Sequence, residues 1–139
     1  MPAIRDITTA VYRLLAADGA LAGMCGIYKG AKRPVRAANP SLTVRAERLA
    51  RGGGEGIWMC DITVTAYADM LPNGTAGTET LDGIMGRVNT LLADAEIELA
   101  GAKTMPLIEG DSTGPLWDRA HADEAYCERV YGLLFVGFR

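Results

Sequence analysis

The chain has 139 residues, a mass of 14.8 kDa and a formal net charge of −3. This length is typical of one domain, and 49% hydrophobic with 22% charged residues excludes an intrinsically disordered chain. The longest apolar stretch, residues 132–138, is far shorter than the ~20 residues of a membrane helix. We therefore expect one domain over residues 1–139, made in the cytoplasm, with no membrane partner.

Metal and cofactor sites have few candidate ligands. The three cysteines, Cys25, Cys60 and Cys127, form no Cys-x-x-Cys pair, and His121 is the single histidine. A structural zinc site needs about four such ligands. We predict reduced, buried thiols, no metal and no cofactor.

The first 40 residues predict a helix followed by a loop. Apolar residues recur at helical spacing, which predicts a helix over 3–17: Ile4, Ile7, Val11, Leu14 and Leu15. A short apolar turn over 20–24 and a brief extended piece over 26–28 follow. Residues 29–40 contain two prolines and four charges, and we expect an exposed loop.

The middle of the chain alternates with a period of two residues, which is the pattern of a half-buried strand. Residues 42–47 and 57–67 carry this pattern, and a glycine-rich turn over 52–56 separates them. In the second segment Cys60, Ile62 and Val64 share one face. We expect one long hairpin.

The last third of the chain repeats the order of helix and hairpin. Thr78 is a candidate cap for a helix that continues toward Ala95. Residues 103–109 predict an edge strand because they contain a proline, 109–118 a loop, and 125–138 a final strand. The fold class is therefore α+β: an antiparallel sheet built from two long hairpins, with two helices packed on one face.

One short motif resembles a catalytic loop. Residues 110–116, Gly-Asp-Ser-Thr-Gly-Pro-Leu, differ by one residue from the loop around the nucleophile of trypsin-like proteases. That chemistry needs a histidine base and a buried aspartate from earlier in the chain. His121 follows Ser112 instead of preceding it, so we interpret the motif as a structural loop and predict no catalytic residue.

Charge is divided unevenly along the chain. Residues 1–54 hold nine Lys or Arg and three Asp or Glu, whereas residues 55–139 hold five and fourteen. Two solvated faces explain this division. Alternatively, the basic face of one copy meets the acidic face of the next, which closes a ring or extends a filament. Nucleic-acid binding by the basic stretch is a third reading, but no aromatic residues are interleaved with it and the pI is about 5.1.

The order of elements resembles that of bacteriophage tail-completion, or tail-terminator, proteins. The similarity extends over nearly the whole chain. Its most characteristic parts are the segment Leu-Leu-Ala-Ala-Asp-Gly-Ala-Leu-Ala and Asn39-Pro40 leading into a strand. The basic loop with its prolines, the strand over 57–67 and the apolar final strand are also similar.

This resemblance implies a structural protein of the virion tail or neck, without enzymatic activity. It implies a ring, expected to be a hexamer, that caps the tail tube and meets the head-side connector or stopper protein. Partners would then be other copies of the chain and the major tail tube protein, with DNA passing through the channel without specific binding. Assembly would take place in the host cytoplasm. Alternatives are another head–tail joining protein, or a small ferredoxin-like enzyme or ligand-binding dimer.

We predict that the contacts of this ring are electrostatic. The basic residues of the 29–51 stretch would contact the acidic 94–124 region of a neighbouring subunit or of the tail tube. The candidate interface residues are Lys32, Arg33, Arg36, Arg45, Arg48, Glu96 and Glu98.

Overall fold

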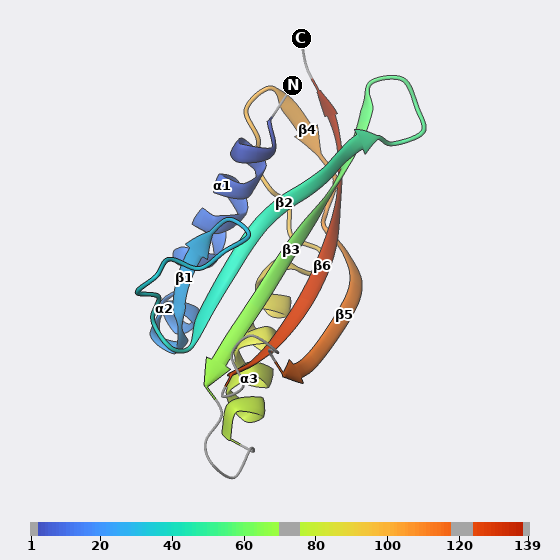
Figure 1. Cartoon of the computed structure of the whole chain (residues 1–139). Helices are drawn as coiled ribbons and strands as arrows, with labels where there is room; N and C mark the ends of the chain where they lie inside the picture. Colours follow the sequence, from blue (N-terminus) through green and yellow to red (C-terminus); the bar gives the residue numbers. More distant parts are fainter. Residues whose placement is uncertain (1–2, 70–75, 118–123, 138–139) are drawn as a thin grey trace.

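The fold is a curved sheet with helices on one side (Figure 1). The computed structural model describes residues 3–69, 76–117 and 124–137. In chain order its elements are α1 (Ile4–Ala16), α2 (Gly19–Met24), β1 (Gly26–Lys29), β2 (Ser41–Arg51), β3 (Ile57–Asp69), α3 (Ala76–Leu92), β4 (Ala102–Thr104), β5 (Ile108–Trp117) and β6 (Glu124–Gly137).

The strand order is β1-β2-β3-β6, and both β4 and β5 pair with the outer edge of β6. All pairs are antiparallel except β1–β2, which is parallel. The α+β class is confirmed. The first expected hairpin is β2–β3. The second was expected from residues 103–109 and 125–138, but the main partner on the outer edge of β6 is β5, and the parallel strand β1 lies outside the expected pattern.

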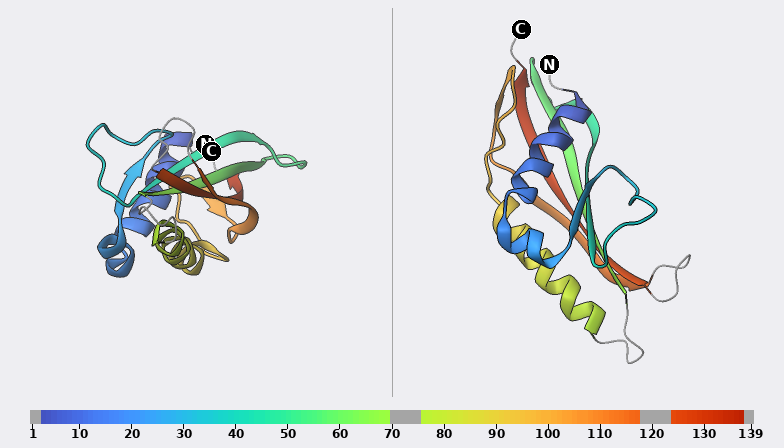
Figure 2. Two further views of the ribbon diagram at one scale, coloured as in Figure 1. Left: turned by 60° about the horizontal axis from the view of Figure 1, so that its bottom comes forward. Right: turned by 90° about the vertical axis from the view of Figure 1, so that its left-hand side faces the viewer.

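The core lies between the sheet and the helices. Along β3, Cys60, Ile62 and Val64 point to this side and are buried. The helices present their own apolar stripes to them, from Ile7 to Leu15 on α1 and from Leu81 to Leu92 on α3. Figure 2 shows both helices against the same side of the sheet, which confirms the expected packing.

Residues 20–24 are helical, so the prediction of a simple turn was wrong. The Asp18 carboxylate accepts a hydrogen bond from the Leu21 amide at 2.9 Å and caps the N-terminus of α2. The same carboxylate forms an ion pair with Arg87 of α3, with Nη2 and Oδ1 2.5 Å apart. A short segment with two glycines is held helical by a residue 69 positions away.

The prediction of a loop over 109–118 was also wrong, because residues 108–117 form β5. Asp118 lies outside the described residues. Glycine, proline and hydroxyl residues are typical of loops, but the outer edge of β6 offers backbone partners along its length. Two register shifts accommodate the irregular sequence. Gly114 has a φ of +101°, and a Cβ there would lie 2.6 Å from the Tyr126 carbonyl oxygen.

The predicted strand over 103–109 is broken where it contains Pro106. β4 ends at Thr104, and the chain turns inward before β5 begins at Ile108. The Met105 amide still donates to the Leu134 carbonyl, but the Leu107 amide donates to the Ala95 carbonyl instead of to β6. Leu107 is buried by this detour.

The start of the second long helix differs from the sequence-based expectation. α3 begins at Ala76, so Thr78 lies inside the helix and not at its cap. β6 is an interior strand that lies between β3 and the strands β4 and β5, and its Leu133 and Phe135 are buried.

Candidate functional site

The side of the sheet opposite α1 and α3 is called the open face. Strand alternation places a polar row across its middle. Cross-strand register aligns these side chains on β2, β3 and β6: Arg45, Glu47, Asp61, Thr63, Thr65, Tyr67, Tyr126 and Glu128.

The loop over residues 30–40, called the basic loop, is fixed to one end of the open face. The Arg33 guanidinium forms a two-pronged ion pair with the Glu124 carboxylate, and its Nη1 lies 2.8 Å from Oε2. The same guanidinium lies 3.9 Å from the centroid of the Tyr67 ring. The side chains of Arg33 and Glu124 are only 21% and 12% exposed, so this pair is shielded from water.

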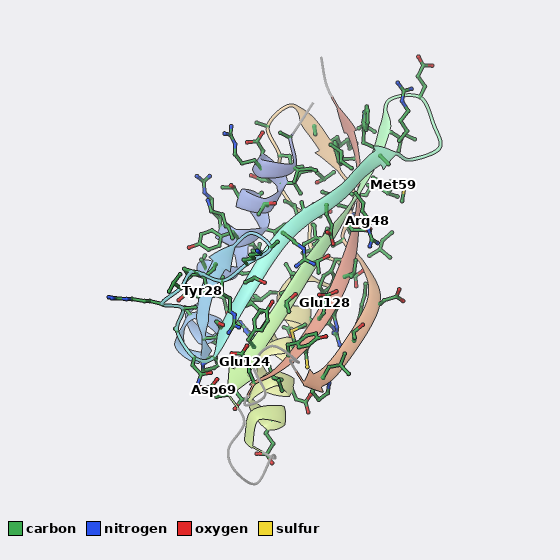
Figure 3. The ribbon with its side chains drawn as sticks, in the orientation of Figure 1. Tyr28, Arg48, Met59, Asp69, Glu124 and Glu128 are labelled. Carbon is green, nitrogen blue, oxygen red and sulfur yellow. The ribbon has the colours of Figure 1, made fainter. Side chains whose placement is uncertain are left out.

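A second set of hydrogen bonds holds the return of the basic loop into β2. The Asn39 side chain donates to the Asp69 carboxylate at 2.8 Å and accepts from the Asp69 amide at 3.0 Å. The Ala38 amide donates to the Tyr28 hydroxyl at 2.8 Å. Figure 3 shows Asp69 and Glu124 at the same end of the sheet.

Charged side chains in the middle of the open face pair with one another. Arg45 lies 3.5 Å from Glu47 and 3.8 Å from Glu128. The Thr63 hydroxyl donates to Glu47 at 2.7 Å, and this hydrogen bond, followed by the charge of Arg45, lowers the pKa of Glu47. A polar groove of about 370 Å³ lies here. Its lining residues are Ala31, Arg45, Thr65, Tyr67, Tyr126 and Glu128.

The other end of the open face is apolar. A groove of about 360 Å³, called the apolar groove, runs between β3, β6 and β5. Its apolar lining includes Met59, Ile108, Val130 and Leu134. Met59 is 44% exposed and Ile108 57% exposed, and they line the groove from the two strands that flank β6.

Charged side chains border the apolar groove. Arg48, Asp61, Glu109 and Asp111 contribute to its lining. Arg48 pairs with Asp61 at 3.4 Å, and Glu109 pairs with Arg129 at 3.3 Å. Asp111 is exposed, and no ion pair with another described residue reaches it. The border therefore has an acidic side.

Three of the predicted interface residues lie on or over the open face, and each has an acidic partner within the chain. Arg33 pairs with Glu124, Arg45 with Glu47 and Glu128, and Arg48 with Asp61. Part of the uneven charge division is therefore neutralised inside one subunit. Contact of these residues with a neighbouring subunit stays a prediction.

The other predicted residues are exposed. Lys32 and Arg36 lie in the basic loop, and Glu96 and Glu98 lie in the extended segment between α3 and β4. Within the described ranges no ion pair involves any of the four. The structure does not bring these basic and acidic residues together within one chain.

Glu124 belongs to the acidic 94–124 region that was expected to contact a neighbouring subunit or the tail tube, whereas it pairs with Arg33 of its own chain. Sequence reasoning did not find Glu128 as a partner of Arg45, and it did not find the apolar groove. The alternation along 57–67 places Asp61 and Met59 on the face opposite the core, so their position could be predicted from the sequence. The positions of Val130 and Leu134 beside β3 could not be predicted, because they depend on the register between β3 and β6. Ile108 joins the groove only because β5 is a strand.

The protease-like motif lies in β5. Ser112 is exposed and aligned with Arg129 of β6, while His121 lies outside the described residues. The three cysteines are free and buried, as expected, and burial raises the pKa of Cys25 and of Cys60 to about 11. Among the described residues no group of three or more His, Cys, Asp or Glu is placed to hold a metal ion.

None of the helices in the described ranges has the length and apolar character needed to cross a membrane.

Comparison with known proteins gives a structural match. No protein-family model matches the sequence, and no curated protein matches it. Among solved structures, the chain is similar to one described as "Virion of native gene transfer agent (GTA) particle", with a TM-score of 0.78 and 19% sequence identity. The match covers 99% of this chain and 100% of that chain. The two chains therefore share a fold over nearly their whole lengths.

Proposed function

We propose that this chain is a structural protein of a virion, and that it acts as a tail terminator. In this role a ring of copies caps the tail tube and presents its other side to the head-side connector. The observation that carries the proposal is the fold shared, end to end, with a chain of a virion particle. The resemblance of the sequence to tail-completion proteins supports the finer assignment.

The surface of the molecule fits assembly. Large apolar side chains that are exposed in one groove are typical of interaction sites, and Met59 and Ile108 both line the apolar groove. The basic loop offers a second contact surface at the other end of the open face. Two different surfaces on one subunit suit head-to-tail contacts, which close into rings.

The proposed partners are other copies of the chain, expected to number six, the major tail tube protein and the head-side connector or stopper. The overall acidic balance lets DNA pass through the channel without being held. We place the protein at the tail or neck of the virion, after assembly in the host cytoplasm.

Sedimentation and negative-stain imaging of the purified chain test the ring. The proposal predicts a species of about six subunits and annular particles, as expected for closed heterologous contacts. A chain that stays a monomer or a two-fold dimer at every concentration, and that does not form rings on tail tubes, would contradict it.

A head–tail joining protein of the neck is the competing assignment. The two roles differ in what their loss does to the tail. Loss of a terminator leaves the tube without a stop, whereas loss of a joining protein leaves complete tails of normal length that lack heads. Tail length therefore separates the two.

A further inference from the structure

We propose that the tip of the basic loop, centred on Val35, inserts into the apolar groove of the next copy of the chain. The inference rests on the proposed ring, and it names the two surfaces that build it.

The tip has the features of an anchor. Val35 is fully exposed, and Lys32 and Arg36 beside it are exposed as well. The loop is nevertheless fixed on both sides of the tip, by the Arg33–Glu124 pair and by the hydrogen bonds of Asn39. An apolar side chain presented on a fixed loop loses little conformational freedom on binding.

The apolar groove has the complementary chemistry. Its floor is made by Met59, Ile108, Val130 and Leu134, and a β-branched side chain such as valine fits an apolar floor of this kind. At its border lie Asp111, Glu109, which is paired with Arg129, and Arg48, which is paired with Asp61. The acids outnumber the bases there. Lys32 and Arg36 of an incoming tip would meet this acidic border, and such complementarity fixes register more than it adds affinity.

The tip cannot reach the groove of its own chain. Arg33 holds the basic loop at Glu124, the first residue of β6, and Val35 is two residues away. The groove lies at residues 130–134 of the same strand, about 20–33 Å further along at about 3.3 Å per residue.

The two surfaces therefore lie apart on one molecule. Figure 3 shows Glu124 near one end of the sheet and Met59 near the other. The basic loop also follows β1, the first strand of the sheet, whereas β5 lies against the opposite edge (Figures 1 and 2). A tip in one copy and a groove in the next make a heterologous contact, which repeats around a closed ring.

Disulfide trapping tests the contact. The variant Val35→Cys/Ile108→Cys carries one thiol on the tip and one in the groove, while the native cysteines are buried and free. Under mild oxidation we expect a ladder of covalent oligomers that a reductant collapses. The matched control is Val35→Cys/Leu116→Cys, because Leu116 is also exposed on β5 but does not line the groove.

Mixing the single variants sharpens the result. Val35→Cys mixed with Ile108→Cys should give a covalent dimer with one copy of each, and neither variant alone should. Dimers of Val35→Cys with itself would indicate a two-fold contact between tips and would overturn the inference. Cross-linking of Val35→Cys to a different virion protein, and not to this chain, would overturn it as well.

Charge reversal gives an independent readout. Lys32→Glu/Arg36→Glu should weaken self-association about tenfold, because two exposed charge pairs are lost at every contact. Arg5→Glu/Arg13→Glu on α1 makes the same change in net charge away from the tip and should leave association unchanged. Equal effects of the two variants would overturn the inference.

Failure of the inference and failure of the proposed function are distinguishable. If the ring forms but the cross-link does not, the tip-in-groove contact is rejected and the terminator role still stands. If particles lacking this protein have tails of normal length, the terminator role is rejected, whatever the result of the cross-linking experiment. A chain that neither associates nor cross-links overturns the inference.

Discussion

At the scale of single residues, Asp18 joins three elements. Its carboxylate caps α2 and pairs with Arg87 of α3, directly after the end of α1. The hydrogen bond from the Arg87 side chain, followed by that from the Leu21 amide, lowers the pKa of Asp18 from its ordinary value of 3.8 to about 2. Folding therefore favours the charged, deprotonated form of the Asp18 carboxyl over its neutral form.

This pKa predicts how stability depends on pH. A carboxyl whose pKa is lowered by folding stabilises the fold above its unfolded pKa, and that contribution is lost as pH falls from about 4 to about 2. Asp18→Asn keeps a capping oxygen but removes the charge. We expect a lower urea midpoint than wild type at pH 7 and no difference near pH 2. Asp111→Asn, at an exposed position, should show little difference at either pH; a gap for Asp18→Asn that persists unchanged to pH 2 would contradict the assignment.

At the scale of elements, the ion pair between Arg33 and Glu124 fastens the basic loop to β6. Glu124→Gln removes the carboxylate charge that faces the shielded guanidinium of Arg33, and weakening a shielded charged hydrogen bond costs about 1–3 kcal/mol. We expect the basic loop to detach more often, so trypsin should cleave after Lys32 and Arg36 faster than in wild type.

The matched control for this variant is Glu96→Gln, which changes an exposed carboxylate that forms no ion pair within the described ranges. Its cleavage rate should equal that of wild type. Equal rates for Glu124→Gln and Glu96→Gln would show that the ion pair does not hold the loop.

Elements with regular periodicity were predictable from the sequence, and those made by distant contacts were not. The stripes of α1 and α3 and the alternation of β3 follow directly from residue spacing. α2 has six residues and depends on Arg87, which lies far along the chain. β5 has a loop-like composition and is a strand because β6 presents an unpaired edge to it.

The candidate site was predictable to a similar degree. Charge counting identified Arg33, Arg45 and Arg48 as a basic group, and the polar face of β3 was visible in the alternation. Which acid each arginine contacts depends on cross-strand register, as with Arg45 and Glu128. Because the apolar groove depends on β5, a prediction that treats residues 109–118 as a loop cannot include this groove.

At the scale of the whole molecule, the ion pairs within the chain reduce the number of basic residues that we expect to contact another copy. Arg33, Arg45 and Arg48 are engaged within the chain, so Lys32 and Arg36 are the basic residues of the set free to meet another copy. Exposed charges are screened within about 8–10 Å at physiological salt. We expect self-association, measured by sedimentation, to weaken as salt rises, and to weaken less in Lys32→Glu/Arg36→Glu.

An association constant that does not change with salt would contradict this charge-based part of the contact. The apolar part, with Val35 against the floor of the groove, would then account for the affinity. Association that strengthens with salt in both the wild type and Lys32→Glu/Arg36→Glu would also indicate an apolar contact, because salting-out conditions favour burial of apolar surface.

We propose that this chain ends the tail tube, and the length of tails in particles lacking the protein is the most direct test. Particles are produced from a genome with the coding sequence deleted and measured by electron microscopy, with the wild-type chain supplied in trans as the control. We expect tails of irregular length without heads, and normal tails when the chain is restored. Tails of uniform, normal length in its absence would contradict the claim.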